Sequence, residues 1–246
     1  MMRVLGVIPA HLESQRLSRK LLRPICGRPM IVWVYEHSRR AACLDGLLVA
    51  TDSTEIFDYC RSSNIPVQMT SAAHRSGTDR IVEVMSRERA EVYVNIQGDE
   101  PMITAEHIEL LLRPFAGAPG TQVSTLKVAI SPEEARDPNN VKVVTDHKGS
   151  ALYFSRALIP HDRDGAGSAR YYKHLGLYAY TAPALEKFHT FPPSALEQVE
   201  KLEQLRFLEN NVPIMVVETT QDTIGVDTEE DLQKVEKYFR ELGVRD

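Results

Sequence analysis

The chain has 246 residues, of which 43% are hydrophobic and 26% charged, with a formal net charge of −5. This size and composition are typical of a globular protein, and the acidic balance argues against a protein that binds nucleic acids. Three cysteines without a C-x-x-C pair indicate neither a disulfide framework nor a zinc site and favour a reducing, cytoplasmic compartment, and no apolar run approaches the ~20 residues that membrane insertion needs.

Short apolar runs alternate with amphipathic segments in the first half of the chain. They predict strands at residues 3–9, 46–51, 66–69 and 92–97, and helices at 29–42, 54–61 and about 78–89. Strands that alternate with helices in this way imply βαβ units. The expected fold class is therefore α/β, with a mostly parallel central sheet flanked by helices.

The second half of the chain is more mixed. Strands are expected at residues 123–130, 141–145, 174–180 and 213–218, and a helix at 196–210. Thr228 is an expected N-cap, with acidic residues in the first turn that follows, where the helix dipole favours them. No repeat or linker demands a domain break, so residues 1–246 are expected to form a single domain.

The predicted helix at 196–210 carries an apolar stripe. Its members are Leu196, Val199, Leu202 and Leu205. Such a stripe normally packs in the core. Glu203 and Gln204 lie off the stripe, so by default they are expected to face solvent.

A cationic loop follows the first predicted strand. It reads PAHLESQRLSRKLL at residues 9–22 and contains Arg16, Arg19 and Lys20. Ligands of open parallel sheets bind at the carboxyl ends of strands, and cations there offset charge on a polyphosphate. The loop is neither a dinucleotide fingerprint nor a P-loop, since both glycine patterns are absent. A solvated basic loop is the alternative.

The segment HRSGTDR at residues 74–80 indicates a turn that starts a helix, with Thr78 as the expected N-cap. The turn would expose backbone groups that can read the edge of a nucleobase. Spacing alone leaves both roles open.

Two acidic segments are candidates for a metal site. NIQGDEP at residues 95–101 ends a buried strand with Gly98 and Asp99, and Mg²⁺ in proteins takes one or two carboxylates plus substrate phosphates. The alternative is a turn aspartate that caps the next helix. In GVDTEED at 225–231, Thr228 already supplies the cap, which leaves Asp227 free to be a second metal ligand. Elsewhere, Arg156 and His174 would suit a carboxylate ligand.

Taken together, these segments resemble the CMP-Kdo synthetases, the 3-deoxy-manno-octulosonate (Kdo) cytidylyltransferases. The matching strings run in order from about residue 4 to 232: VIPA, GRPMI, VATD, SGTDR, NIQGDEP, DPNNVKVV, ALYFSRALIP, YKHLGLYAY, LEQVEKLEQLR and GVDTEEDL. As a set they are specific to this family among the sugar nucleotidyltransferases.

The resemblance implies a reaction and a fold. CTP and Kdo would give CMP-Kdo and pyrophosphate, for lipopolysaccharide biosynthesis, with Mg²⁺ as cofactor. The fold would be Rossmann-like, of the nucleotide-diphospho-sugar transferase type, with a smaller mixed dimerisation lobe. The protein would be a homodimer, and about residues 150–185 would serve the sugar pocket and the dimer interface.

The resemblance also implies site residues. The metal ligands would be Asp99 and Asp227, with Lys20 as a third catalytic residue. The CTP site would be formed by Pro9, Ala10, His11, Ser14, Arg16, Lys20, His74, Ser76 and Gly77. The sugar acid would be bound by Gln97, Arg156, His174, Tyr178, Glu203 and Gln204, with Arg156 at its carboxylate.

The nucleotide loop departs from the family pattern PARYxSxRLPGKPL. His11 replaces an arginine, which removes a permanent cation, and Ser18-Arg19 replaces Pro-Gly. The lost glycine predicts a changed backbone path, because glycine reaches positive φ freely. This departure leaves open a non-catalytic paralogue that binds nucleotide. The same chemistry on 8-amino-Kdo or another sugar acid also stays open, because the pocket segments would look much alike.

Overall fold

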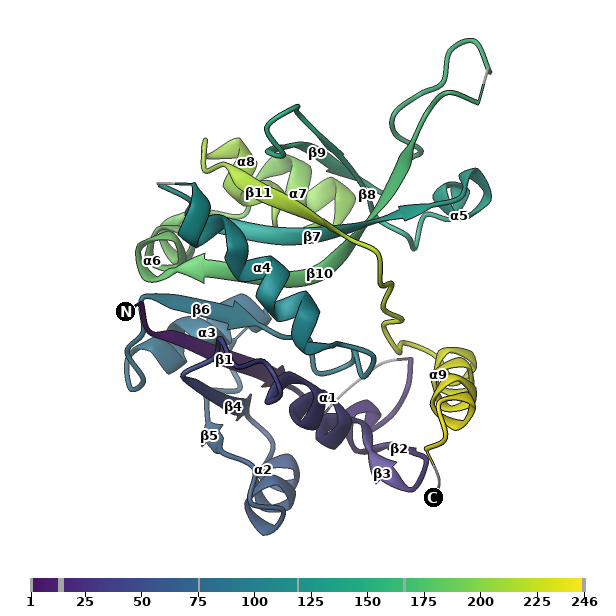
Figure 1. The fold of residues 1–246 in the computed structure, drawn as a ribbon. Coiled ribbons are helices and arrows are strands. Elements are labelled where there is room, and N and C mark those ends of the chain that lie inside the picture. The colour runs from purple at the N-terminus through teal and green to yellow at the C-terminus, as the bar shows by residue number, and fades with distance from the viewer. Residues whose placement is uncertain (1, 13–15, 75, 119, 166, 245–246) are drawn as a thin grey trace. The chain divides into compact units, whose positions relative to one another are not determined.

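The computed structural model describes residues 2–12, 16–74, 76–118, 120–165 and 167–244 (Figure 1). The chain forms two compact units. The first unit contains Met1–Glu109 and Thr223–Asp246, and the second contains Leu110–Asp222. The first unit is thus built from two separate stretches of the chain.

The first unit contains a parallel sheet in the order β6-β1-β4-β5. Its strands are β1 (Val4–Ala10), β4 (Gly46–Thr51), β5 (Val67–Met69) and β6 (Val92–Asn95), and β2 (Pro24–Ile25) and β3 (Arg28–Pro29) form a separate antiparallel pair. Its helices are η1 (Lys20–Leu22), α1 (Met30–Ser38), α2 (Thr54–Ser62), α3 (Gly77–Met85) and α9 (Glu229–Glu241). The predicted α/β fold with a parallel sheet is confirmed.

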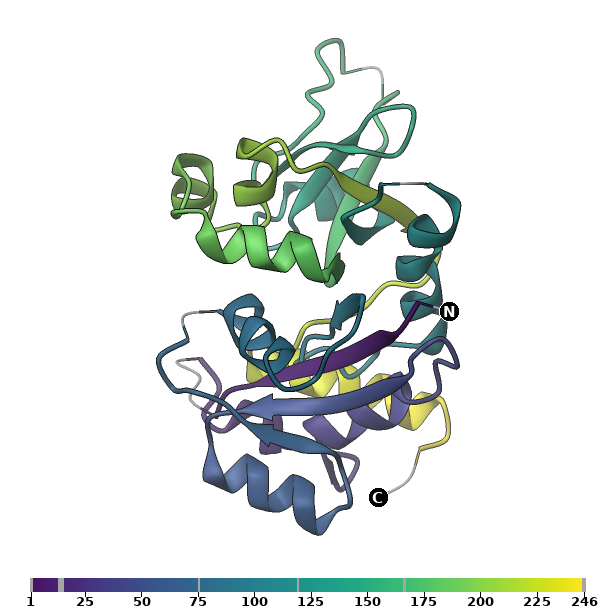
Figure 2. The same ribbon diagram turned by 90° about the vertical axis from the view of Figure 1, so that its left-hand side faces the viewer.

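Helices cover the sheet of the first unit on both faces. Figures 1 and 2 show α1 and α3 on opposite sides of the strands. Nearly all of β1 is buried, as a continuous apolar strand covered on both faces should be. Helix α9 joins α1 through the rings of Trp33 and Phe239, whose centroids lie 4.8 Å apart. Thr228 caps α9 as predicted, in a capping box with Asp231.

The second unit has a mixed sheet. Strand β7 pairs with β10 in antiparallel and with β11 in parallel orientation, and β8 pairs with β9 and β10. The strands are β7 (Val123–Ile130), β8 (Lys142–Thr145), β9 (Ala151–Ser155), β10 (Tyr171–Thr181) and β11 (Ile214–Thr219). The helices are α5 (Pro132–Arg136), α6 (Ala182–Thr190), α7 (Ala195–Glu200) and α8 (Leu205–Glu209), while α4 (Ala105–Gly117) crosses the boundary between the units along the chain.

The predicted single helix at 196–210 is wrong. Lys201 adopts a left-handed conformation, with φ 56°, and separates α7 from α8. The break changes the direction of the chain, so the apolar stripe does not stay on one face. Leu202 and Leu205 are buried, but Val199 is 82% exposed. Gln204, expected in solvent, is buried.

Other differences are smaller. Ser76, not Thr78, is the N-cap of α3, and its hydroxyl accepts a hydrogen bond from the Asp79 amide. Thr78 lies inside the helix and is buried. The sequence pattern also missed β2, β3, η1, α4, α5, β9 and α6. No helix within the described ranges is long and apolar enough to cross a membrane.

Candidate active site

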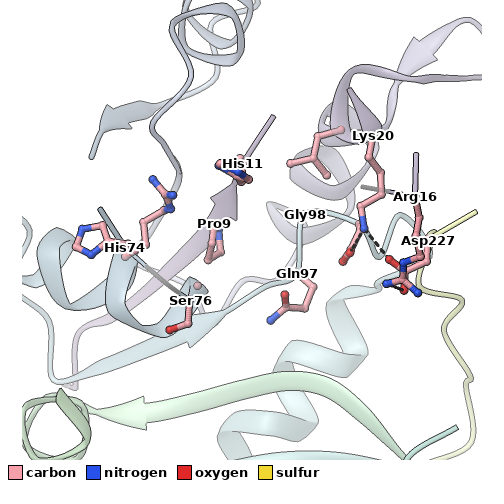
Figure 3. A pocket seen from close by; sticks show the side chains of 14 residues that line it. Pro9, His11, Arg16, Lys20, His74, Ser76, Gln97, Gly98 and Asp227 are labelled. Carbon is pink, nitrogen blue, oxygen red and sulfur yellow. Dashed lines mark hydrogen bonds and ion pairs between the residues drawn. The ribbon is translucent and has the colours of Figure 1, made fainter. Parts of the chain in front are cut away.

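A polar cavity of about 510 Å³ lies in the first unit, at the carboxyl ends of β1 and β6 (Figure 3). It is lined by Pro9, Ala10, His11, Arg16, Lys20, Leu21, His74, Ser76, Gly77, Arg80, Gln97, Gly98, Asp99 and Asp227. Every residue predicted to bind nucleotide or metal is present except Ser14, which lies outside the described residues. Gln97, predicted to bind the sugar acid, also lines the cavity.

Lys20 lies between the two predicted metal ligands. Its Nζ donates to Asp99 Oδ2 at 2.5 Å and to Asp227 Oδ1 at 3.0 Å, while Arg16 Nη2 lies 2.8 Å from Asp227 Oδ2. Burial by itself would lower the pKa of Lys20, but the two carboxylates outweigh it and leave that pKa raised. Two cations and two carboxylates therefore balance in charge within one corner of the cavity (Figure 3).

Two backbone features bring the carboxylates together. The Val226 amide donates to the Asp99 carbonyl at 2.9 Å, which fixes the segment before α9 beside the turn after β6. Gly98 passes so close to β1 that an added Cβ would lie 3.0 Å from the Pro9 carbonyl oxygen. Glycine at this position lets the turn approach the strand. Asp99 is therefore held at the end of the sheet by neighbours on both sides.

The nucleotide loop keeps the left-handed turn that the glycine of the family pattern would allow. Arg19 has φ 55° and ψ 34°, immediately before Lys20. A non-glycine residue pays about 1–2 kcal/mol for this conformation. The guanidinium of Arg19 pairs with Glu55 at the start of α2. Arg19 thus adopts a conformation that glycine reaches freely, and the expected change of backbone path in the loop stays a prediction.

His11 is part of a network that the sequence pattern did not reveal. Its Nδ1 lies 2.9 Å from Asp52 Oδ2, and Arg80 Nη2 donates to the same oxygen at 3.0 Å. Burial would raise the pKa of Asp52, but these two partners outweigh it and hold that pKa below its usual range. Asp52 follows the end of β4, so the rule about carboxyl ends of strands could have pointed to it. Nearby, His74 Nε2 lies 2.6 Å from Glu83 Oε2.

The other predicted sugar-acid residues belong to the second unit. His174 in β10 lies 3.0 Å from the Thr125 hydroxyl and packs edge-on against Phe154. Burial lowers the pKa of His174 to about 3, so the ring is neutral near pH 7. The ring therefore offers neutral hydrogen bonds, and the role of His174 in sugar binding stays a prediction.

Two further polar groups of the second unit are buried. The Tyr178 hydroxyl lies beside Thr125 but makes no hydrogen bond of ordinary geometry, and Gln204 Nε2 has no partner among the residues that the structure describes. Burial, with smaller effects of Tyr180 and Glu203, outweighs the Thr125 contact and raises the pKa of Tyr178 well above 10. Buried polar groups are normally hydrogen-bonded. These two are thus poorly satisfied by the part of the chain that the structure describes.

Arg156 is braced by main-chain carbonyls. Its Nε donates to the Glu200 carbonyl at 3.0 Å and its Nη1 to the Pro138 carbonyl at 3.1 Å. The carbonyl of Arg156 accepts a hydrogen bond at 2.7 Å from the ammonium of Lys142, which is fully buried. The sequence pattern gave no sign of this contact, because Lys142 lies inside a predicted strand. No carboxylate among the described residues forms an ion pair with the Arg156 guanidinium. Main-chain carbonyl groups therefore orient the Arg156 side chain, and no acidic side chain of the described residues neutralises its charge.

The chain has close relatives of known name. A family model described as cytidylyltransferase matches residues 5–219. A protein named 3-deoxy-manno-octulosonate cytidylyltransferase from Acidobacterium capsulatum is 53% identical to this chain over 238 residues, which cover 97% of this chain and 97% of that protein. A protein of the same name from Koribacter versatilis is 51% identical over 238 residues, which cover 97% of this chain and 90% of that protein.

The chain belongs to this cytidylyltransferase family.

Solved structures agree with the membership. A structure of CMP:2-keto-3-deoxy-manno-octonic acid synthetase complexed with CTP matches with a TM-score of 0.94 at 42% identity, over 98% of this chain and 99% of that one. A cytidylyltransferase from Leptospira borgpetersenii, at 14% identity and a TM-score of 0.64, shows the same fold alone. Like its relatives, this cytidylyltransferase is a nucleotidyltransferase enzyme.

The cavity of this cytidylyltransferase can accommodate a divalent cation. Asp99 and Asp227 offer hard oxygen atoms, and both already face one positive group, the Lys20 ammonium. Mg²⁺ binds one or two protein carboxylates and fills its other positions with phosphate oxygens and water. The donor set therefore fits Mg²⁺ in the presence of a nucleotide.

Proposed function

We propose that this chain transfers the cytidylyl group of CTP to Kdo, giving CMP-Kdo and pyrophosphate for lipopolysaccharide biosynthesis. The observation that carries the proposal is the Lys20 ammonium between Asp99 and Asp227, in a cavity at the carboxyl ends of parallel strands. The names of the relatives, and the complex of the related synthetase with CTP, support the same reaction.

The chemistry is an in-line displacement at phosphorus. The anomeric hydroxyl oxygen of Kdo bonds to the α-phosphorus, the bond to the bridging oxygen breaks, and pyrophosphate leaves with that electron pair. The hydroxyl proton passes to water. Lys20 and Arg16 offset the charge on the leaving oxygens. Asp99 and Asp227 would hold Mg²⁺, which when bound screens phosphate charge and lowers the pKa of the attacking hydroxyl.

The nucleotide contacts follow from the ends of β1 and α3. Pro9, Ala10 and His11 extend from β1 along the cavity, and Ser76 and Gly77 open α3 with their amides at its positive end. We infer that the α3 turn reads the cytosine edge and that the cationic loop holds the triphosphate. His74 would border the base, and Ser14, outside the described residues, stays a predicted CTP contact.

The second unit supplies the sugar-acid contacts in this proposal. Arg156 meets the carboxylate, because its guanidinium is oriented and has no acidic partner among the described residues. Tyr178 and Gln204 satisfy their buried donors on hydroxyl groups, and His174 adds a neutral contact. Glu203 and, from the first unit, Gln97 complete the set inferred for the sugar.

We further propose that the enzyme is a cytoplasmic homodimer and that about residues 150–185 contribute to its interface. Within that range Leu152, a large apolar side chain that is 62% exposed, supports this. Light scattering on the wild type and on Leu152→Glu tests it. A monomeric wild type would contradict the proposal.

Pyrophosphate release tests the reaction directly. The purified protein is incubated with CTP and Mg²⁺ and with Kdo, 8-amino-Kdo or a sialic acid. We expect turnover with Kdo and none after chelation of the metal. Turnover with 8-amino-Kdo alone would change the substrate, and the absence of both turnover and calorimetric CTP binding would leave a non-catalytic paralogue.

A further inference from the structure

The Lys20 ammonium occupies the space that a metal ion would need. It lies 2.5 Å from Asp99 Oδ2 and 3.0 Å from Asp227 Oδ1, and its side chain is only 12% exposed. A Mg²⁺ ion bonded to the same two oxygens would lie within about 2.1 Å of each. The ion and the ammonium cannot share that space. Metal binding therefore requires that Lys20 leave the two carboxylates.

The neighbouring contacts keep both carboxylates in place. Arg16 holds the second oxygen of Asp227 at 2.8 Å, and the Val226 amide fixes the Asp99 backbone at 2.9 Å. Ion pairs that include hydrogen bonds are about twice as strong as neutral hydrogen bonds. In the free protein, a divalent ion must therefore compete with the Lys20 ammonium for the carboxylates of Asp99 and Asp227, whose charge Lys20 and Arg16 already balance.

We propose that Lys20 is an internal counter-ion that excludes the metal from the free enzyme, and that the CTP triphosphate admits the metal by drawing Lys20 away. The inference rests on the metal site of the proposed function. Since Lys20 begins the short helix η1 within the cationic loop, its ammonium can turn from the carboxylates to phosphate oxygens without a change of fold. The enzyme then gains its metal only when there is a triphosphate to activate.

Such competition has a thermodynamic signature. If CTP releases the carboxylates from Lys20, CTP and the metal must strengthen each other's binding by the same factor. Removal of the ammonium should reduce that mutual effect, because the carboxylates are then already open. The effect concerns binding and is independent of turnover.

The test measures binding of Mn²⁺, an ion of similar ligand preference, by electron paramagnetic resonance without nucleotide. We expect Lys20→Met to bind Mn²⁺ more tightly than the wild type, on the order of tenfold. Arg19→Met is the matched control, because it removes one positive charge from the adjacent position, where the guanidinium contacts Glu55 and not the two aspartates. The control should change Mn²⁺ affinity much less than Lys20→Met.

A second variant and a second condition keep the outcomes distinct. Lys20→Gln repeats the test, and circular dichroism verifies that both variants fold. Equal Mn²⁺ affinity in the wild type and the Lys20 variants, or an equal gain in Arg19→Met, would overturn the inference. The metal site itself is judged separately: with CTP present, the Mn²⁺ bound by the protein, measured against a mixture of Mn²⁺ and CTP alone, should be lost in Asp99→Asn, and its persistence would overturn the proposed ligand instead.

Discussion

The two units of this enzyme present polar groups in opposite ways. The cavity of the first unit holds ionised side chains in contact, with Lys20 between Asp99 and Asp227. The candidate sugar cluster of the second unit is built largely on neutral groups, since His174 and Tyr178 are held uncharged by burial. Formal charges suit phosphates and metal ions, whereas buried neutral donors discriminate hydroxyl groups. In the proposed function, the first unit therefore handles charge and the second unit selects the substrate.

The largest effect should come from the charged cavity. Asp99→Ala removes a carboxylate that faces the reacting phosphate in the proposed mechanism, so we expect turnover to fall by about 10³-fold, as for other preorganised electrostatic groups. Steady-state pyrophosphate release measures it. Asp58→Asn, on the exposed face of α2, is the control and should retain full turnover. Near-normal turnover of Asp99→Ala would remove Asp99 from the mechanism.

A substitution in the neutral cluster of the second unit should affect the use of Kdo and the stability of the protein differently. Tyr178→Phe deletes a buried hydroxyl that lies beside Thr125 but makes no hydrogen bond of ordinary geometry, so the melting temperature should change little. The value of kcat/KM for Kdo should fall about tenfold, because a ligand hydroxyl loses its contact. Tyr238→Phe, on α9, is the control. A destabilised variant with unchanged kcat/KM would give Tyr178 a purely structural role.

The same neutrality predicts a dependence of stability on pH. Burial lowers the pKa of His174 from 6.5 to about 3, so between these values the unfolded chain binds a proton that the folded chain does not. Stability is therefore present above pH 6.5 and is lost as the pH falls toward 3, by about 1–2 kcal/mol at pH 5. Melting curves at pH 7.5 and 5 should show a smaller loss for His174→Gln. His147→Gln is the control, and an equal loss in both variants would argue against a neutral buried ring.

The smallest effect concerns the strained loop. Arg19→Gly and Arg19→Ala both remove the exposed ion pair with Glu55, which is worth little, but only glycine relaxes the left-handed backbone. We expect the glycine variant to be more stable than the alanine variant by about 1 kcal/mol, measured by denaturant unfolding. Equal stability would mean that the loop adopts another backbone conformation in solution.

Local sequence patterns predicted much of the fold. The strands at 46–51 and 123–130 match the structure at both ends, because each is a short apolar run. The break at Lys201 could not be predicted, since every residue around it favours a helix. The burial of Gln204 follows from that break.

The candidate site likewise contains residues that the sequence predicted and residues that it did not. The sequence pointed to Asp99 as a carboxylate at the end of a buried strand, and to Asp227 because Thr228 already supplied the helix cap. The structure brings both onto one ammonium. Their role as metal ligands stays a prediction. The network of Asp52 with His11 and Arg80, and the buried ammonium of Lys142, depend on contacts between distant segments. Such contacts leave no periodic signal in one sequence.

The divided make-up of the first unit has a consequence for biosynthesis. Asp227 belongs to Thr223–Asp246, which follows the whole second unit in the chain. During translation, Lys20 and Asp99 leave the ribosome first, and Asp227 follows only after the whole second unit has been made. A nascent or prematurely ended chain thus lacks the complete cavity. In the proposed mechanism, the set of catalytic residues is therefore complete only after the last segment of the first unit has been made.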